Sequence, residues 1–345
     1  MRSLFSFLYI VSACAFPSLR VEEEQVNHNP SMYLERFENW LVQFTIEIRD
    51  KHHFYDVLKK WMINDEYIDH VNNNHLSYTL GHNQFSGMDE FDFIQYVIKN
   101  PIIQSQPLRT VESNVTVSST LPSSVDWREH NAVTPVKDQG QCGSCWSFST
   151  TGALEGVYSI ESGKLVSFSE QQLVDCDNLK NGGRDHGCNG GLMDNAFSWI
   201  SKNGGLCSEE DYPYMSQEGD TFSCQKECHN VVNSKIKSWV DVQPTDKALM
   251  TAIAQQPVSI AIEADQRDFQ LYKSGVFTGK CGTTLDHGVL VVGYGSQENL
   301  DYYLVKNSWG TTWGDEGYIR LGRGPQYNGG QGQCGILLEA SYPLL

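Results

Sequence analysis

Apolar residues recur at three- and four-residue steps through most of the first hundred positions. Between residue 31 and about residue 100, two runs have this spacing, one with Tyr33, Phe37, Trp40, Leu41 and Phe44 and one with Val57, Trp61 and Ile68. Because this is the period of an amphipathic helix, the pattern predicts a small, mostly helical domain with an apolar stripe. The stretch 101–120 is rich in Pro, Ser and Thr, which is typical of an exposed linker.

Helical spacing returns after residue 145 and gives way to strand patterns after about residue 231. Ser162-Gly163 indicates one helix end, Ser169-x-x-Gln172 predicts a capping box at the start of a second helix, and Gly204 closes a third. The later runs 258–263, 288–293 and 302–306 are short, branched and aromatic, so they predict strands. The expected fold class is α+β, with a helical half that faces a sheet half across a cleft.

The first fifteen residues have the features of a secretory signal peptide. Arg2 gives a positive start, positions 4–11 are mostly apolar, and Ala13-Cys14-Ala15 fits a small-x-small cleavage site. The apolar run is too short to span a membrane, and no other stretch is long enough. The chain is therefore expected to enter the oxidising secretory pathway, and both a lysosome-like acidic compartment and secretion remain open as its destination.

Composition narrows the possible partners. With 25 Lys and Arg against 42 Asp and Glu, the formal net charge is −17, which argues against binding nucleic acid or anionic membranes. The hydrophobic content of 40% is that of an ordinary globular protein, and 345 residues exceed what one compact core usually needs.

Candidate chemistry gathers in the stretch Gln139-Gly140-Gln141-Cys142-Gly143-Ser144-Cys145-Trp146. Helical spacing begins after Trp146, so Cys145 is expected at a helix N-terminus, where the dipole and the unpaired N–H groups favour a thiolate. Without Cys14, nine cysteines remain, so at least one thiol stays free and the other eight allow about 105 pairings. The alternatives are a metal-binding pair, a redox dithiol or two bridged cysteines. Neither a second metal-ligand pair at zinc spacing nor a redox-fold strand before the motif is present, so no metal is predicted.

Cys-Gly-Ser-Cys-Trp after Gln139 resembles the active-site motif of the papain family of cysteine proteases, close to its cathepsin L-like branch. His287 follows Cys145 by 142 residues (287 − 145), and Asn307 follows it by 162 (307 − 145), slightly beyond the usual spacing. The resemblance implies a papain-like two-lobed fold, in which a helical lobe and a β-barrel-like lobe hold the active-site cleft between them. It also implies a signal peptide over 1–15, a helical inhibitory propeptide with linker over 16–120, and a mature peptidase domain over 121–345.

The same resemblance assigns catalytic roles. Cys145 and His287 would form a thiolate–imidazolium pair that hydrolyses peptide bonds through a thioester acyl-enzyme. Asn307 would orient the imidazole, and Gln139 would stabilise the oxyanion. Trp309 would shield the His–Asn hydrogen bond from water. No cofactor is required for this chemistry.

Family position also implies a substrate-binding surface. Its residues would be Gly190, Gly191, Leu192, Met193, Ala261, Leu285, Glu339 and Trp309. Trp313 would line the leaving-group side or belong to the core. The implied function is a secretory-route endopeptidase, made as a zymogen, that prefers apolar residues and also Arg at the second position on the acyl side. The implied partners are protein and peptide substrates, the propeptide itself and cystatin-type inhibitors.

The resemblance selects among the possible disulfides. It implies Cys142–Cys188, Cys176–Cys224 and Cys281–Cys334, and leaves Cys207 to Cys228. An exchange of Cys224 and Cys228 between their partners remains an alternative. Asn114-Val115-Thr116 is the one N-glycosylation acceptor, and it lies in the part that would be removed.

The propeptide part matches the family's motifs with departures. Trp61, Asn64, Ile68 and Asn72 fit the later half of one interrupted motif, but His53 and Val57 stand where Glu and Arg are usual, and Gly87 replaces the usual Asp of a second motif. These departures question the ion pairs that normally hold the prosegment. The loop 178–186 is longer than in papain-like relatives and remains without a role.

The competing prediction is a catalytically inactive homologue that acts as a binding or inhibitory protein. Loss of Cys145, His287 or Gln139 would favour it, and all three are present.

Overall fold

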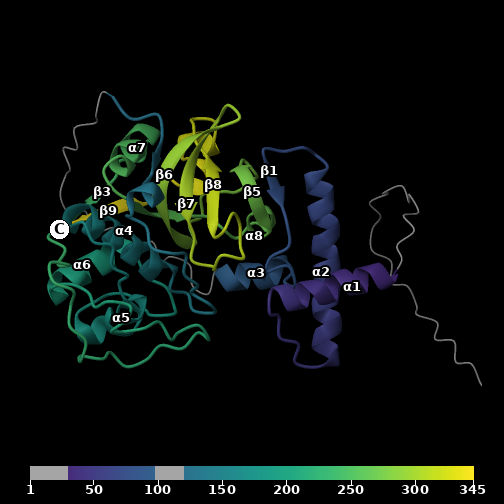
Figure 1. Ribbon diagram of the computed structural model, residues 1–345, viewed down its shortest axis with the longest axis horizontal. Helices are drawn as coiled ribbons and strands as arrows, with labels where there is room; N and C mark the ends of the chain where they lie inside the picture. The colour runs from purple at the N-terminus through teal and green to yellow at the C-terminus, as the bar shows by residue number, and fades with distance from the viewer. Residues whose placement is uncertain (1–29, 98–119) are drawn as a thin grey trace, which may run out of the picture.

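The computed structural model describes residues 30–97 and 120–345 (Figure 1). The expected signal peptide and Asn114 lie outside the described residues. Among the described residues, no helix is long and apolar enough to cross a membrane.

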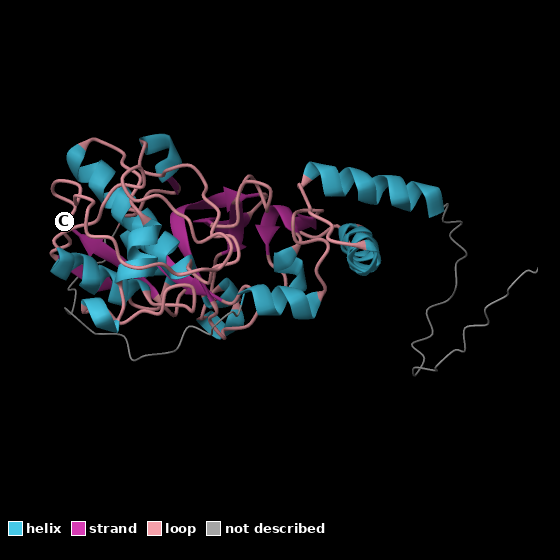
Figure 2. Ribbon diagram, turned by 90° about the horizontal axis from the view of Figure 1, so that it is seen from below, coloured by secondary structure: helices cyan, strands magenta, loops and turns pink. Residues whose placement is uncertain are grey.

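The N-terminal part is built on two crossing helices, α1 (Pro30–Gln43) and α2 (Lys51–Asn72), followed by the shorter α3 (Glu90–Val97) (Figures 1 and 2). Asp50 caps α2 by accepting a hydrogen bond from the backbone N–H of His53. Phe37, Trp40, Val57 and Trp61 form a small buried core between the two helices. The helical period in the sequence therefore located both long helices.

A strand interrupts this mostly helical part, which the periodicity did not predict. Residues Tyr78–Leu80 form β1, which pairs antiparallel with β5 (Tyr272–Phe277) at the edge of the main sheet. The Asn72 side chain holds β1 through both backbone groups of Leu80, at 2.9 and 3.0 Å. Three residues are too few for an alternating pattern, and the strand exists because an open sheet edge is available to it.

The helical lobe contains α4 (Cys145–Ser162), α5 (Glu170–Cys176) and α6 (Met193–Asn203). The helices α4 and α6 end at Gly163 and Gly204, which adopt φ values of 73° and 83°, so the predicted stops are correct. The capping box is only half formed. Ser169 accepts a hydrogen bond from the backbone N–H of Gln172, but the Gln172 side chain accepts from the backbone N–H of Cys207 instead of returning to Ser169.

Within the described residues the strands form a nine-stranded sheet with the order β1-β5-β8-β7-β6-β4-β9-β3, and β2 (Val125–Asp126) pairs with β6. The remaining strands are β3 (Ser238–Asp241), β4 (Val258–Ile262), β6 (His287–Gln297), β7 (Leu300–Lys306), β8 (Tyr318–Gly322) and β9 (Ala340–Leu344). The β5–β8 pair is parallel, whereas the other strand pairs named here are antiparallel. The three predicted strand runs correspond to β4, β6 and β7.

Short helices also occur in and around the sheet half. They are α7 (Asp246–Ile253) and α8 (Arg267–Gln270), together with the 3-10 turns Trp127–His130, Leu179–Asn181, Asn328–Gly330 and Gln333–Gly335. The sequence patterns did not predict these short helices. Thr245 caps α7 by accepting from the backbone N–H of Ala248.

Helix α4 lies between the other helices and the sheet, which explains why it is buried from Cys145 to Ser159. At Gly152 a Cβ atom would lie 2.7 Å from the Leu290 side chain of β6, so glycine permits close contact between the helix and the strand. This contact brings the first residues of α4 and β6 to the same place.

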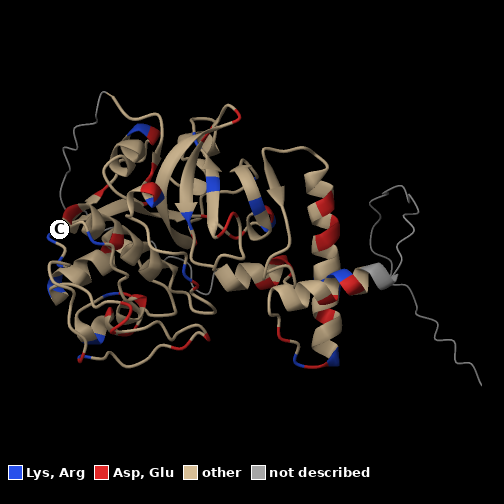
Figure 3. Cartoon of the chain, in the orientation of Figure 1, with Lys and Arg blue, Asp and Glu red and all other residues tan. Residues whose placement is uncertain are grey.

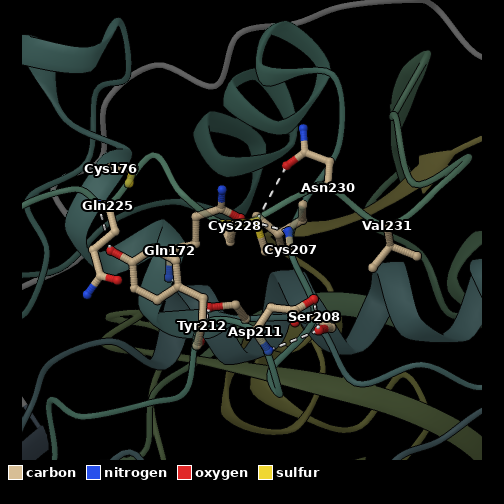
Figure 4. Close-up of a disulfide and its surroundings, with 12 residues drawn as sticks. Gln172, Cys176, Cys207, Ser208, Asp211, Tyr212, Gln225, Cys228, Asn230 and Val231 are labelled. Atoms are coloured by element: carbon tan, nitrogen blue, oxygen red, sulfur yellow. Dashed lines mark hydrogen bonds between the residues drawn. A yellow bond between two sulfur atoms is a disulfide. The ribbon is translucent and has the colours of Figure 1, made fainter.

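The described part of the chain contains four disulfides. Three are the pairs that the resemblance implies, Cys142–Cys188, Cys176–Cys224 and Cys281–Cys334, and the fourth joins the two cysteines left over, Cys207 and Cys228. The exchange of Cys224 and Cys228 does not occur. Figure 4 shows why Cys207 is held in place: its backbone N–H donates to the Gln172 side chain at 2.8 Å, beside Asn230.

Candidate active site

Cys145 is the first residue of α4 and the one free cysteine among the described residues. It is 8% exposed. Ser144 precedes it, and the Ser144 hydroxyl lies 2.8 Å from the Tyr214 hydroxyl. The sequence correctly predicted a thiol at a helix N-terminus.

His287 is the first residue of β6, and Asn307 directly follows β7. The His287 Nε2 atom lies 2.8 Å from the Asn307 Oδ1 atom. Trp309 stacks on the imidazole with 4.6 Å between ring centroids and an angle of 23°. Neighbouring strands therefore bring together a His and an Asn separated by twenty positions, and an indole covers their hydrogen bond.

The start of β6 lies against the start of α4. A Cβ at Gly288 would lie 3.3 Å from the backbone N and Cα of Trp146. The backbone N–H groups of Gly288 and Trp146 act on the Cys145 sulfur and favour its thiolate. The structure thus places Cys145 and His287 at adjoining ends of two elements, one from each half.

Burial nevertheless favours the neutral forms of both groups. It raises the pKa of the Cys145 thiol to about 11 and lowers the pKa of His287 to about 4. This differs from the expected thiolate at the helix N-terminus, because loss of water costs the thiolate more than the nearby N–H groups return.

Aromatic residues of the N-terminal part supply much of this cover. Phe85, Phe93 and Tyr96 surround Trp309, with centroid distances of 5.3, 5.7 and 6.0 Å. The Gln84 side chain donates to the Trp309 carbonyl oxygen at 2.6 Å. The N-terminal part therefore packs on the indole that covers the His–Asn pair.

Gln139 is buried close to this site. Its Nε2 donates to the carbonyl oxygen of Cys142 at 2.9 Å, and its Oε1 accepts from the Ser308 hydroxyl at 2.7 Å. Tyr214 donates to the Gln139 carbonyl oxygen at 2.8 Å. The side-chain amide carries two N–H bonds, so one remains for a further acceptor.

Three residues of the expected substrate pocket, Met193, Ala261 and Leu285, belong to one buried apolar cluster. Leu192 is half-buried at the start of α6. The half-buried Glu339 lies opposite Ala261, because the Ala261 N–H donates to the Glu339 carbonyl oxygen at 2.9 Å. The pocket positions are therefore neighbours in space, although almost 150 positions separate their ends.

Three carboxyl groups, those of Glu339, Asp241 and Asp194, interact at the Glu339 end of this pocket. Burial, followed by the charge of Asp241, raises the pKa of Glu339. The carboxyl group of Asp194 interacts with both Asp241 and Glu339, and burial raises its pKa to about 7. Proximity of like charges adds to these shifts.

Gly190 and Gly191 precede the pocket. Gly190 has a φ of 99°, which favours glycine. A Cβ at Gly191 would lie 2.6 Å from the Trp146 ring, so only glycine lets this backbone approach the helix. Trp313 is fully buried, donates to the Phe269 carbonyl oxygen and packs on Phe269, which places it in the core.

Polar groups tie the N-terminal part to the sheet half. Asn64 donates to the carbonyl oxygens of Ser86 and Met88 and accepts from Arg267. Asn83 donates to the Gln270 carbonyl oxygen at 2.7 Å. The motif position Asn64 and the nearby Asn83 therefore connect the N-terminal part to Arg267 and Gln270 of α8.

The departures from the motif have an apolar explanation. A Cβ at Gly87 would lie 2.8 Å from both Trp40 and Val57. Val57 and Trp40 therefore fill the space beside Gly87, so a larger side chain at this position would clash with them. The N-terminal part does contain an ion pair at another position, between Arg36 and the buried Asp65. His82 Nε2 lies 2.9 Å from the same Asp65 Oδ1 atom.

A buried charge network behind the site was missed by the sequence analysis. Lys137 Nζ lies 2.9 Å from Glu155 Oε1 and 2.6 Å from Glu170 Oε1. Lys306 donates to the Thr134 hydroxyl, which donates to Glu155. Burial lowers the pKa of Lys306 to about 8. The available signal was Glu155, an acid surrounded by small and apolar residues in the middle of the helix that begins with Cys145.

This network lies directly behind the site. A small cavity among these charged groups is also lined by Asn307. Lys306 immediately precedes Asn307, and Glu155 lies on the helix that begins with Cys145. Among the described residues, no cluster of three or more His, Cys, Asp or Glu could hold a metal ion.

Comparison with known proteins gives a consistent result. Residues 121–344 match the model of the family described as papain family cysteine protease. The chain is 46% identical over 321 residues to cysteine protease XCP2 of Arabidopsis thaliana, covering 90% of this chain and 86% of that protein. It is 48% identical over 284 residues to the probable cysteine protease RD21B of the same plant, covering 81% of this chain but only 59% of that protein.

A solved structure has the same architecture. The proform of Amb a 11, a cysteine protease and major ragweed pollen allergen, superposes with a TM-score of 0.81 at 38% identity, covering 92% of this chain and 95% of that one. The fold and the comparisons define a cysteine protease that still carries its prosegment. The chain belongs to the papain family of cysteine proteases.

Proposed function

We propose that this chain is a secretory-route cysteine endopeptidase made as a zymogen, with a signal peptide over 1–15, an inhibitory prosegment with linker over 16–120, and a mature peptidase domain over 121–345. One observation carries the proposal: the free Cys145 begins α4 beside the start of β6, where His287 bonds to Asn307 at 2.8 Å under Trp309. Nucleophile, base and orienting group are the parts that thiol catalysis needs.

The prosegment keeps the site uncharged. When it leaves, water reaches Cys145 and His287, and a proton passes from the thiol to the imidazole. The thiolate attacks the peptide carbonyl, and the oxyanion accepts from the Gln139 amide and the Cys145 N–H, each worth about 3–4 kcal/mol. His287 then protonates the leaving amine and afterwards activates water, which hydrolyses the thioester.

Substrate would bind along Gly190 and Gly191, whose backbones can pair with an extended peptide. The second acyl-side residue would enter the pocket of Leu192, Met193, Ala261, Leu285 and Glu339. The buried apolar members favour Leu or Phe there. The carboxylate of Glu339 adds affinity for Arg, whose planar fork suits bidentate contact.

The disulfides suit an oxidising secretory route. A lysosome-like acidic compartment and the exterior are the two destinations consistent with it. The proposal also includes a glycan on Asn114 and binding of cystatin-type inhibitors to the enzyme.

The test compares the acid-activated wild type with Cys145→Ser and with His287→Ala, using exposed His130→Ala as the matched control. Both site variants should fold and form their disulfides but show little peptidase activity, whereas the control keeps it. N-terminal sequencing should find the cut near Leu121. Near-normal turnover by Cys145→Ser would point to another nucleophile, and an inactive wild type with a correctly removed prosegment would favour a binding protein.

A further inference from the structure

The long loop between Cys176 and Cys188 has a buried carboxyl group near each of its ends, Asp177 and Asp185. Asp177 leaves α5 with no exposed surface, and Asp185 is 2% exposed. Between them the chain makes a 3-10 turn, Leu179–Asn181, whose start is capped by the Asn178 side chain. The loop therefore returns Asp185 to the carboxyl that begins it.

Each carboxyl group uses one oxygen for ordinary partners. Asp177 Oδ1 accepts from the Arg184 N–H at 3.0 Å. Asp185 Oδ1 accepts from the Leu192 N–H at 3.0 Å and from the Asn195 side chain at 2.9 Å. Among the described residues, neither Oδ2 atom has any donor, although both are buried.

The two carboxyl groups lie close enough for the charge of Asp177 to act directly on Asp185. Two buried carboxylates repel each other when both are ionised, and neither buried Oδ2 atom has a donor, so one proton on the pair relieves the repulsion. Burial and the neighbouring charge of Asp177 raise the pKa of Asp185 well above its usual range, and burial raises that of Asp177 to about 6. The proton thus belongs to the pair.

The charged side chains near Asp177 and Asp185 do not take over the role of that proton in compensating the two carboxyl groups. Lys202 of α6 acts on Asp177 from a distance, while Arg184 is exposed and contributes only its backbone N–H. Asp175 of α5 is engaged by Gln171 and other donors. Helix α4 presents the uncharged Trp146, and no group of three metal-binding side chains occurs among the described residues.

Two glycines let the backbone close tightly on the pair. A Cβ at Gly183 would lie 1.8 Å from Asp177 Oδ1. A Cβ at Gly191 would lie 2.7 Å from the Asp185 carboxyl carbon. Asp185 therefore lies directly against Gly191 and holds the next residue, Leu192, through its backbone N–H.

We propose that Asp177 and Asp185 share one proton, and that the protonated pair positions Gly191 and Leu192 to receive the substrate backbone. The inference rests on the proposed function, which assigns substrate binding to these two residues. When the proton leaves, two buried like charges repel each other and displace the loop that carries Gly191. Substrate binding weakens as pH rises, while the chemistry at Cys145 is unaffected by this pair.

The first measurement is KM and kcat against pH for the activated wild type and for Asp185→Asn. An Asn at 185 keeps the acceptor for Leu192 and supplies a permanent N–H donor to Asp177. Wild-type KM should rise roughly tenfold from about pH 5 to about pH 8, equivalent to about 1.4 kcal/mol. KM of Asp185→Asn should stay level over that range, and kcat should follow the same pH profile in both.

Asp177→Asn should behave like Asp185→Asn, since its amide can donate to an ionised Asp185. The matched control is Asp211→Asn, an exposed carboxylate of the same lobe, which should retain the wild-type rise in KM. A rise in KM that persists in Asp185→Asn overturns the positioning role. A wild-type rise abolished by added Ca²⁺ or altered by EDTA overturns the shared proton in favour of a bound cation.

The second measurement is independent of catalysis. The infrared difference between wild type and Asp185→Asn at neutral pH should contain the band of one protonated carboxyl group. Absence of that band overturns the shared proton even in an active enzyme. If the band is present but the activated wild type hydrolyses no peptide, the proposed function fails while the proton pair stands.

Discussion

The guanidinium carbon of Arg267 lies 3.9 Å from the centroid of the Tyr67 ring, and this contact joins the peptidase domain to its prosegment. The same guanidinium donates to Asn64 Oδ1 at 2.8 Å and to the Ile63 carbonyl oxygen at 2.9 Å. The next residue, Asp268, accepts from the hydroxyls of Tyr67 and Tyr78. Two adjacent residues of the short helix α8 thus hold both α2 and β1 of the prosegment (Figure 1).

Replacing Arg267 with Ala should therefore speed activation. Charge-assisted hydrogen bonds contribute about 1.5–3 kcal/mol, so the prosegment should be held roughly ten- to a hundredfold less tightly. The rate of prosegment removal from the full chain at one fixed pH measures this. Arg128→Ala is the control, because Arg128 pairs with Asp126 outside the prosegment contacts. Equal processing rates in the two variants would contradict the assignment.

The reactivity of Cys145 should depend on the prosegment. With its pKa raised to about 11 by burial, the thiol of the zymogen is protonated at neutral pH. Iodoacetamide labelling of the zymogen should be slow and should rise about tenfold per pH unit as the thiolate forms. After prosegment removal, labelling at neutral pH should be fast. Cys145→Ser gives the background, and equal rates before and after removal would show that the prosegment does not keep the thiol neutral.

Glu339 should make substrate choice depend on pH. Burial and Asp241 raise its pKa, so it keeps its proton to higher pH and becomes negative only as pH rises. Cleavage after Arg-Arg relative to Phe-Arg should therefore increase with pH in wild type. Because the group is partly exposed, the change should be about two- to fivefold. In Glu339→Gln the ratio should stay low and level, while the exposed Glu298→Gln should behave as wild type.

Glu155→Gln should destabilise the fold. Glu155 is 1% exposed and accepts from Lys137 and Thr134, so removing its charge leaves Glu170 as the remaining carboxylate of this network beside two lysines. The free energy of unfolding should fall by about 3–5 kcal/mol, measured by denaturant unfolding of the zymogen. The control Glu161→Gln, exposed near the end of the same helix, should change it by less than about 0.5 kcal/mol. A similar loss in both variants would exclude a special role for the buried network.

The acidic residues show that the sequence does not reveal which charged side chains are buried. Figure 3 shows Asp and Glu along α2 in the prosegment, where solvent and nearby basic groups accommodate them. Glu155, Asp177 and Asp185 look the same in the sequence, yet all three are buried. A charge pattern reports composition, but burial depends on what packs against each side chain, so these three could not be recognised beforehand.

The sequence by itself determined the local features of this protein. The long helices, the glycine stops of α4 and α6, the strands β4, β6 and β7, and a thiol at a helix N-terminus all follow from short-range spacing and backbone preference. The order of Cys145, His287 and Asn307 indicated the family because that motif is specific.

Only the tertiary structure decided what depends on contacts between distant segments. It paired β1 with the sheet edge, directed the Gln172 side chain to the Cys207 N–H, and raised the pKa of the buried Cys145 thiol. It also brought Asp185 against Asp177 and Gly191. Hydrogen bonding at an open edge, competition for a donor, and loss of water are set by neighbours in space, which the order of residues does not specify.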